Sequence, residues 1–221
     1  MMYGMVELIN ITPDCDKLIA YAARTCKNSF KNSTDEKDLL LVKNCIKAGH
    51  NHILQHAQAS FQLTGSRVFS HQIVRHWTGC YCQQSQRNVK VNDYIIPPSM
   101  KNHKSEIKEC FNQIESLIKK LRSEYNIPLE DVRYLLPNAS KTIITTTMNF
   151  RTLRSFFNQR FHASAQWEIK TIACGMYYLL TQYSICFYDF KDKFDKAVEL
   201  LNKKYNLKMI TSNKKVWFEI S

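Results

Sequence analysis

The order of apolar and polar residues predicts strands and amphipathic helices that follow one another without a linker. Alternating or β-branched runs, typical of strands, occupy Met5–Ile11, Ser60–Thr64, Lys141–Met148 and, as an extended stretch, Gln83–Ile96. Helical spacing runs from Pro13 to about Cys26 and through Lys37–Ala48, Ser66–Trp77, Lys104–Tyr125, Glu130–Leu135, Phe150–Arg160 and Ala165–Phe187. We therefore expect one domain over residues 1–221, of the α/β (α+β) class, with a mixed sheet flanked by helices.

Residues with strong positional preferences mark the helix ends. Thr12 is suited to cap the first helix, with Pro13 at its first position. The run Ser33-Thr-Asp-Glu36 resembles a capping box, and Gly49 is placed to end the second helix. Asn149 is suited to cap the helix that follows it, and a ligand contact is equally open for this residue.

Charge and composition limit the classes of function. The chain has 31 basic and 19 acidic residues, a formal net charge of +12, which attracts phosphates on nucleotides, cofactors or nucleic acids. The lysine-rich runs Lys101–Lys120 and Lys203–Lys215 are expected to be solvated faces. We see neither an apolar run long enough to cross a bilayer nor a secretion signal, so we expect a cytoplasmic protein.

The eight cysteines show no disulfide framework. In a reducing compartment we expect thiols that are mostly buried as small hydrophobes. Cys80 and Cys82 stand close together, but C-x-C without a second ligand pair is weak evidence for zinc, and we expect no metal site. Packing is favoured over thiolate reactivity for both.

The five glycines exclude the usual phosphate loops. They stand at positions 4, 49, 65, 79 and 175, which cannot form G-x-G-x-x-G or a Walker loop. A dinucleotide would therefore be held by side chains and helix ends.

Arginines supply the most informative chemistry. Seven lie inside otherwise apolar segments, where an unpaired charge is costly, so they need anionic partners: Arg67, Arg75, Arg87, Arg133, Arg151, Arg154 and Arg160. If the stretch after Cys82 is a strand, Gln83, Ser85 and Arg87 point to one side. Such a surface suits a phosphorylated, planar, hydrogen-bonding ligand. For Ser85, hydrogen bonding to phosphate is favoured over a nucleophilic role, since no base accompanies it.

A second cluster spans residues 149–169. On a helix, Arg151 and Ser155 are neighbours, whereas Arg160 points elsewhere and should serve a different anion. For Gln166, Trp167 and Glu168 we expect ordinary helix packing and surface charge.

Several motifs in this order resemble the flavin-dependent thymidylate synthases. They are Thr12-Pro-Asp, Ala22-Ala-Arg-Thr-Cys26, Gly49-His50, Gln55-His-Ala57, Ser70-His-Gln-Ile-Val-Arg-His76, Gln83-Gln-Ser-Gln-Arg87, Asp131-Val-Arg133 to Thr142, Asn149-x-Arg151 and Ala165-Gln-Trp-Glu-Ile169. The resemblance covers nearly the whole chain. It implies a homotetramer with active sites shared between subunits. It also implies methylation of dUMP to dTMP, with methylenetetrahydrofolate as carbon donor and FAD, reduced by NADPH, as hydride donor.

The resemblance also implies residue roles. The dUMP-binding positions would be Gln72, Arg75, Gln83, Gln84, Ser85, Gln86, Arg87, Arg133 and Arg160. The FAD-binding positions would be His52, Arg75, His76, Trp77, Gln83, Asn149, Arg151 and Ser155. Arg160 would activate the pyrimidine by stabilising charge on its ring, so that no covalent enzyme nucleophile is needed.

The chain departs from the family pattern mainly on the expected FAD side. Trp77 replaces the second arginine of Arg-His-Arg, Ser155 a usual His or Asn, Phe150 a small residue, Asn88 a frequent Tyr and Gln159 a usual Leu. Trp77 would either stack on a ring of FAD or fill its space. If flavin use is altered or lost, the alternative is a folate-dependent pyrimidine nucleotide 5-hydroxymethylase. A second alternative is a non-catalytic homologue that binds nucleotides or nucleic acids, although no nucleic-acid module is visible.

Overall fold

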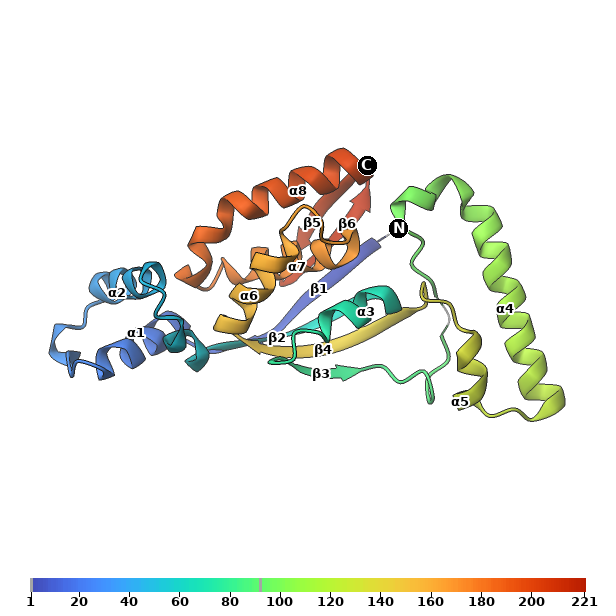
Figure 1. The fold of residues 1–221 in the computed structure, drawn as a ribbon, viewed down its shortest axis with the longest axis horizontal. Coiled ribbons are helices and arrows are strands. Elements are labelled where there is room, and N and C mark those ends of the chain that lie inside the picture. The colour runs from blue at the N-terminus through green and yellow to red at the C-terminus, as the bar shows by residue number, and fades with distance from the viewer. Residues whose placement is uncertain (1, 92) are drawn as a thin grey trace.

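The computed structural model describes residues 2–91 and 93–221 and contains a six-stranded sheet of order β3-β4-β2-β1-β6-β5 (Figure 1). The strands are β1 (Met2–Ile11), β2 (Gln58–Ser66), β3 (Cys80–Gln83), β4 (Lys141–Asn149), β5 (Leu207–Ser212) and β6 (Lys215–Ile220). All five strand pairings are antiparallel. The α/β class is confirmed, whereas the expected mixed sheet is antiparallel.

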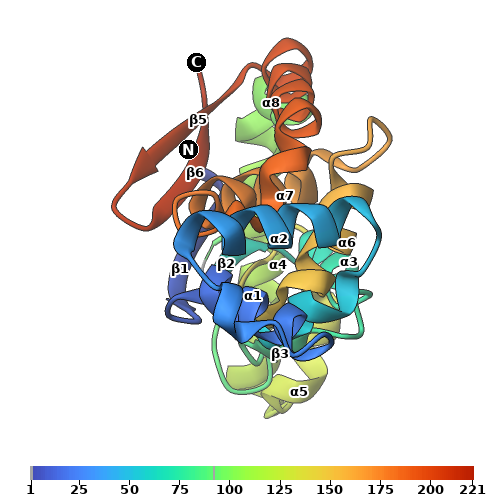
Figure 2. The ribbon, with the colours of Figure 1, turned by 90° about the vertical axis from the view of Figure 1, so that its left-hand side faces the viewer.

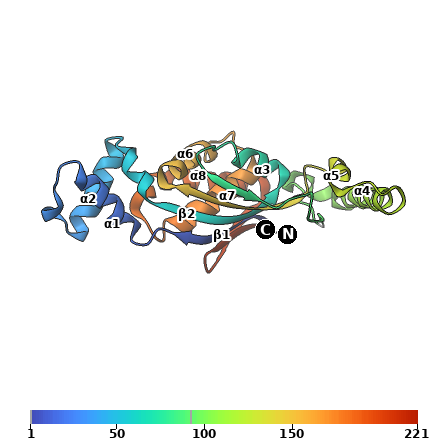
Figure 3. The same cartoon turned by 90° about the horizontal axis from the view of Figure 1, so that it is seen from below.

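The central pair of strands fixes which face is the core. β2 and β4 pair without interruption from Gln58↔Asn149 to Ser66↔Lys141. Phe61 and Leu63 are fully buried on one face, and Gln62 between them is half-buried on the other. The helices α3 (Arg67–Ile73), α6 (Phe150–Arg160), α7 (Trp167–Leu180) and α8 (Lys191–Tyr205) lie on the buried face (Figure 3).

Two helical pairs extend beyond the ends of the sheet. α1 (Cys15–Thr25) packs on α2 (Asp35–Lys47) at one end, and α4 (Lys104–Tyr125) and α5 (Leu129–Val132) lie at the other (Figure 1). Figure 2 looks from the α1–α2 end and shows the β5–β6 hairpin at the edge of the sheet. α7 is the centre of the core, with thirteen of its fourteen residues buried, whereas α4 has no buried residue.

Local signals placed several helix ends correctly. The cap at Asn149 is confirmed, since its Oδ1 accepts from the Thr152 N–H at 2.9 Å. Gly49 follows α2 with φ 78°, as predicted. The cap of α2 is Thr34, which accepts from the Lys37 N–H, and not Ser33 of the predicted capping box, whose hydroxyl donates to Asp38. The cap predicted at Thr12 is wrong. Its hydroxyl instead bonds the Gln58 backbone across to β2, and α1 begins later, at Cys15.

Two other helices end earlier than predicted. The helix predicted over Ser66–Trp77 ends at Ile73, and the one predicted to reach Phe187 ends at Leu180. The run Lys203–Lys215 holds the end of α8, β5 and a turn, although its lysines are exposed as expected.

The cysteines are less buried than expected. Cys15, Cys174 and Cys186 are buried, but Cys26, Cys80, Cys82 and Cys110 are exposed. The expected packing of Cys80 and Cys82 is wrong, because both lie on the open face of the edge strand β3. None of the described helices has the length and apolar character needed to cross a membrane.

Candidate active site

Arg160 and His76 form the best-defined contact among the predicted site residues. At the end of α6, Arg160 Nε donates to His76 Nε2 at 3.1 Å, and Nη2 donates to the Gln72 carbonyl at 3.3 Å. Arg160 is half-buried, and no carboxylate among residues 2–91 and 93–221 pairs with it. A cation with only neutral acceptors keeps its charge available for a ligand.

The imidazole of His76 is held neutral. Burial, and then the nearby charge of Arg160, lowers the pKa of His76 to about 4. Since Nε2 accepts from Arg160, the ring proton must reside on Nδ1. The ring edge also packs on Phe156, with centroids 4.8 Å apart at 78°.

Tyr81 fixes the backbone that carries His76. Its phenol lies 2.9 Å from the Ile73 carbonyl and 2.7 Å from the His76 carbonyl. Burial raises the pKa of Tyr81 to about 12, so the phenol stays a donor. β3 is thereby tied to the turn after α3.

The segment after β3 is a turn and not a continued strand. Gln83 is the last strand residue, and its Nε2 donates to Ser70 Oγ at 3.3 Å and Thr142 Oγ1 at 3.2 Å. Ser85 Oγ then accepts from the Arg87 N–H at 3.2 Å. The predicted alternation of Gln83, Ser85 and Arg87 on one face is therefore wrong, because the chain turns at residues 86–88.

Arg87 and Arg133 lie at a second cluster, around α5. Arg87 Nε is 2.8 Å from Glu130 Oε2, and Arg133 Nε donates to the Glu130 carbonyl at 3.0 Å. Burial and the charge of Arg133 lower the pKa of Arg67, which has no acidic partner in the described chain. Two arginines that repel each other without an acid between them suit a bound anion.

A cavity of about 590 Å³ opens between the turn after β3, α4 and α5. Gln86 and Arg133 line it together with the cations Lys90, Lys119 and Arg122. The Gln86 Nε2 is buried and has no hydrogen-bond partner among the described residues. This basic cavity touches two predicted nucleotide-binding residues.

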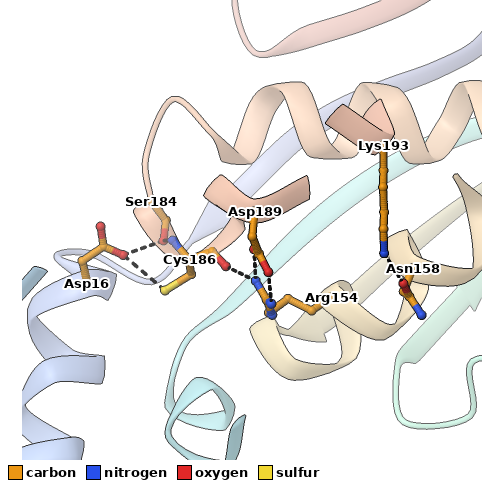
Figure 4. A network of polar contacts seen from close by, with 7 residues as sticks. All are labelled: Asp16, Arg154, Asn158, Ser184, Cys186, Asp189 and Lys193. Carbon is orange, nitrogen blue, oxygen red and sulfur yellow. Dashed lines mark hydrogen bonds and ion pairs between the residues drawn. The ribbon is translucent and has the colours of Figure 1, made fainter. Parts of the chain in front are cut away.

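The anionic partner of Arg154 is a side chain of the same chain and not a ligand. Both Nη atoms bind Asp189 at 2.7 Å, and Nη1 also donates to the Cys186 carbonyl at 2.6 Å (Figure 4). Asp16 extends this network through Ser184 and Cys186. Arg154 is therefore a structural residue.

The predicted FAD-side residues gather around the start of α6. Thr78 Oγ1 lies 2.8 Å from Thr152 Oγ1 and ties the turn that carries Trp77 to α6. Trp77 is 85% exposed, and Arg151 is exposed and without an ion pair to any described residue. Ser155 is exposed one turn further along α6.

The segment that carries His52 completes this region. The 3₁₀ turn Asn51–His56 packs against α6, and the Phe150 N–H donates to the Ala57 carbonyl at 2.9 Å. Phe150 itself is fully buried and packs on Phe187, so its departure from the family pattern belongs to the core.

Glu168 was mispredicted as surface charge. It is 1% exposed and accepts from the Ser66 N–H at 2.6 Å and from Ser66 Oγ at 2.5 Å. Gln166 is the N-cap of α7, which agrees with the ordinary helical role expected for it. Ser66 also caps α3, so Glu168 joins α7 to the helix that leads to His76. The sequence did contain a signal for this buried contact, because Glu168 is an acidic residue within an otherwise apolar helix.

One chain does not gather all predicted nucleotide-binding residues. Gln72 and Arg160 meet at His76, while Gln86, Arg87 and Arg133 meet near α5. Arg75 and Gln84 are exposed. The described residues contain no group of three or more acidic, His or Cys side chains placed to hold a metal ion.

Comparisons with known proteins show which family this chain resembles. A family profile described as "thymidylate synthase complementing protein" matches residues 7–184. The flavin-dependent thymidylate synthase of Saccharolobus solfataricus is 37% identical over 187 residues, with 77% of this chain and 70% of that protein covered. The enzyme of the same name from Clostridium tetani is 34% identical over 198 residues, with 77% and 80% covered.

Solved structures share the fold. Thymidylate synthase X (ThyX) from Helicobacter pylori, crystallised with FAD and dUMP, matches with a TM-score of 0.69 and 21% identity over 88% of this chain and 99% of that one. A second structure of that protein, also with FAD and dUMP, matches with the same score and 24% identity over 83% and 98%.

Proposed function

This chain belongs to the flavin-dependent thymidylate synthase family, and from that premise we propose that it methylates dUMP to dTMP, with methylenetetrahydrofolate as carbon donor and reduced FAD as hydride donor. NADPH is the proposed reductant of FAD. The observation that supports this most strongly is Arg160, a half-buried cation whose hydrogen bonds within the described residues are all to neutral acceptors.

The chemistry requires such a cation. Carbon 5 of uracil is a weak nucleophile until negative charge accumulates on ring nitrogen 3 and the oxygens beside it. A fixed guanidinium stabilises that charge, which in a dry site is worth about 3 kcal/mol or more. With Arg160 in this role, no covalent enzyme nucleophile is needed, and Ser85 has no base beside it in the described residues.

The remaining substrate contacts are proposed for side chains of α3, the turn after β3 and α5. Gln72 and Gln83 are suited to the uracil and sugar, and Ser85, Arg87 and Arg133 to the phosphate. Within the described residues Arg87 and Arg133 bond Glu130, whereas Arg160 bonds His76 and Gln72, and we propose that a second copy completes each site in a homotetramer.

FAD fits the residues around the start of α6. Arg151 supplies a cation for its phosphates, and Trp77 supplies an exposed aromatic face for stacking. Asn51, beside His52, has a buried Oδ1 without a partner among described atoms, which can accept from an amino or hydroxyl group. When bound there, FAD would supply the hydride, and these residues would orient it.

A product assay tests the proposal. Purified protein is incubated with FAD, NADPH, dUMP and methylenetetrahydrofolate, and the nucleotides are identified by mass spectrometry. We expect dTMP, and its loss in Arg160→Ala with the oligomeric state unchanged. Full activity of Arg160→Ala would remove the role assigned to Arg160.

Trp77 favours one alternative reaction, the hydroxymethylation of the nucleotide. An exposed tryptophan at this position can also displace the flavin, and water would then add where hydride is expected. The product would be a 5-hydroxymethyl nucleotide, heavier than dTMP by one oxygen atom. Detection of that product without bound flavin would replace methylation with hydroxymethylation.

A further inference from the structure

We propose that His76 is the positioning residue of Arg160: its neutral ring accepts the Nε–H and aims the end-on edge of the guanidinium at the pyrimidine. The inference rests on the proposed function and deepens it. It assigns to His76 a task distinct from the flavin contact that the sequence motif implies.

The hydrogen bonds of Arg160 divide its guanidinium into a used edge and an available one. Nε donates to His76 and Nη2 to the Gln72 carbonyl, and these two nitrogens form the side edge of the group. Nη1 and the outer hydrogen of Nη2 form the end-on edge, which has no partner in the described chain. Two parallel donors on that edge match the adjacent acceptors of the ring anion, which are ring nitrogen 3 without its proton and a flanking oxygen.

A neutral acceptor is the chemical type that this task requires. A carboxylate beside Nε would orient Arg160 equally well, but its charge would offset the field that the pyrimidine must feel. A lysine would repel the guanidinium. An imidazole in its neutral form orients the group and leaves the net positive charge in place.

The fold holds the ring from three sides. Phe156 lies one helical turn before Arg160 on α6, so the same imidazole packs on one side chain of that helix and accepts from the next. Tyr81 fixes the backbone of residue 76 from β3. Arg160 is the charged group that acts on the ring, and the Tyr81 phenol, with a pKa near 12, stays neutral.

Three substitutions separate positioning from packing. His76→Phe keeps a ring against Phe156 but removes the acceptor. His76→Gln places an amide oxygen near the position of Nε2, and His76→Asn places one near Nδ1, too short to reach Arg160. The matched control is His103→Gln, on an exposed histidine outside the site.

The readout is the ionisation of bound nucleotide, which requires no turnover. FAD-loaded protein is titrated with 5-fluoro-dUMP, and the ¹⁹F shift is followed against pH to give the pKa of ring nitrogen 3. In wild type and His103→Gln we expect that pKa to fall on binding, because Arg160 stabilises the ring anion. We expect His76→Phe and His76→Asn to lose most of this fall, and His76→Gln to keep it.

Turnover should follow the same order. His76→Phe should lower kcat by roughly tenfold to a hundredfold, with the KM for dUMP changed less than about threefold, whereas His76→Gln stays within about fivefold of wild type. If His76→Phe keeps the wild-type ¹⁹F titration and loses only FAD affinity, His76 serves the flavin and the inference is overturned. If wild type itself does not bind 5-fluoro-dUMP, the proposed function fails first.

Discussion

Replacing Glu168 by Gln tests whether one buried carboxylate holds the site-bearing helix in place. Glu168 accepts two hydrogen bonds from Ser66, whose Oγ in turn accepts from the Phe69 N–H as the cap of α3. Burial raises the pKa of the Glu168 carboxyl, and the two bonds from Ser66 oppose that shift. Both bonds are short, as charge-assisted bonds are.

The expected loss follows from those bonds. A Gln amide keeps one acceptor oxygen but turns an N–H₂ toward a residue that donates from both its backbone and its hydroxyl. Charge-assisted bonds exceed neutral ones by about 1 kcal/mol each. Two bonds give a loss of about 2 kcal/mol in the free energy of unfolding, which for a chain of this size lowers Tm by about 4–8 °C.

Urea unfolding at one fixed protein concentration measures this loss. Glu199→Gln is the control, because Glu199 is exposed on α8 and makes no hydrogen bond or ion pair within the described chain. We expect the control to stay within about 0.5 kcal/mol of wild type. If Glu168→Gln changes stability no more than the control, the link between α7 and α3 is not energetically significant.

Three further predictions test other parts of the account. Trp77→Ala should weaken FAD binding about tenfold through lost stacking, and an unchanged flavin titration would show that Trp77 does not contact FAD. Asp189→Asn should cost about 1 kcal/mol in urea unfolding, because the half-buried Arg154 loses the charge of an exposed bidentate partner; dUMP affinity should not change. Lowering the pH from about 6.5 to about 4 should reduce the free energy of unfolding. In this range His76 becomes protonated in the unfolded chain, whereas in the native protein its lowered pKa keeps it largely neutral. That part is on the order of 2 kcal/mol and should vanish in His76→Gln, whereas an equal acid slope in the variant would assign it to other groups.

Local rules predicted the helices that carry the site because their signals lie within a few residues. The bounds Phe150–Arg160 and Lys104–Tyr125 and the cap at Asn149 agree with the structure. Each depends on helical periodicity, capping chemistry and the residues beside the helix end. Such signals act before any tertiary contact forms.

Local rules could not predict the contacts between segments that are far apart in the sequence. The run after Cys82 has the alternation of a strand, but β3 has only β4 beside it, and the chain turns once Gln83 bonds Ser70 and Thr142. The partner of Arg154 lies 35 positions away, at Asp189. Nothing local to either residue indicates the pair.

Predictions from charged residues were least accurate where the charged side chain is buried. Glu168 looks like a surface acid because most glutamates are exposed, yet α7 is buried on nearly every side and its acid is satisfied by Ser66. The seven structured arginines were expected to need anions. Arg154 has one inside the fold, Arg87 has Glu130, and Arg160 has only neutral acceptors.

A crystal structure of the protein with FAD and dUMP bound would test the central claim most directly, because it places the pyrimidine relative to Arg160. We predict that the end-on edge of the guanidinium lies about 3 Å from ring nitrogen 3 or a flanking oxygen, while Nε still donates to His76. The phosphate should lie on Arg87 and Arg133, contributed where necessary by a neighbouring copy. A uracil ring held away from Arg160 in every copy would contradict the account.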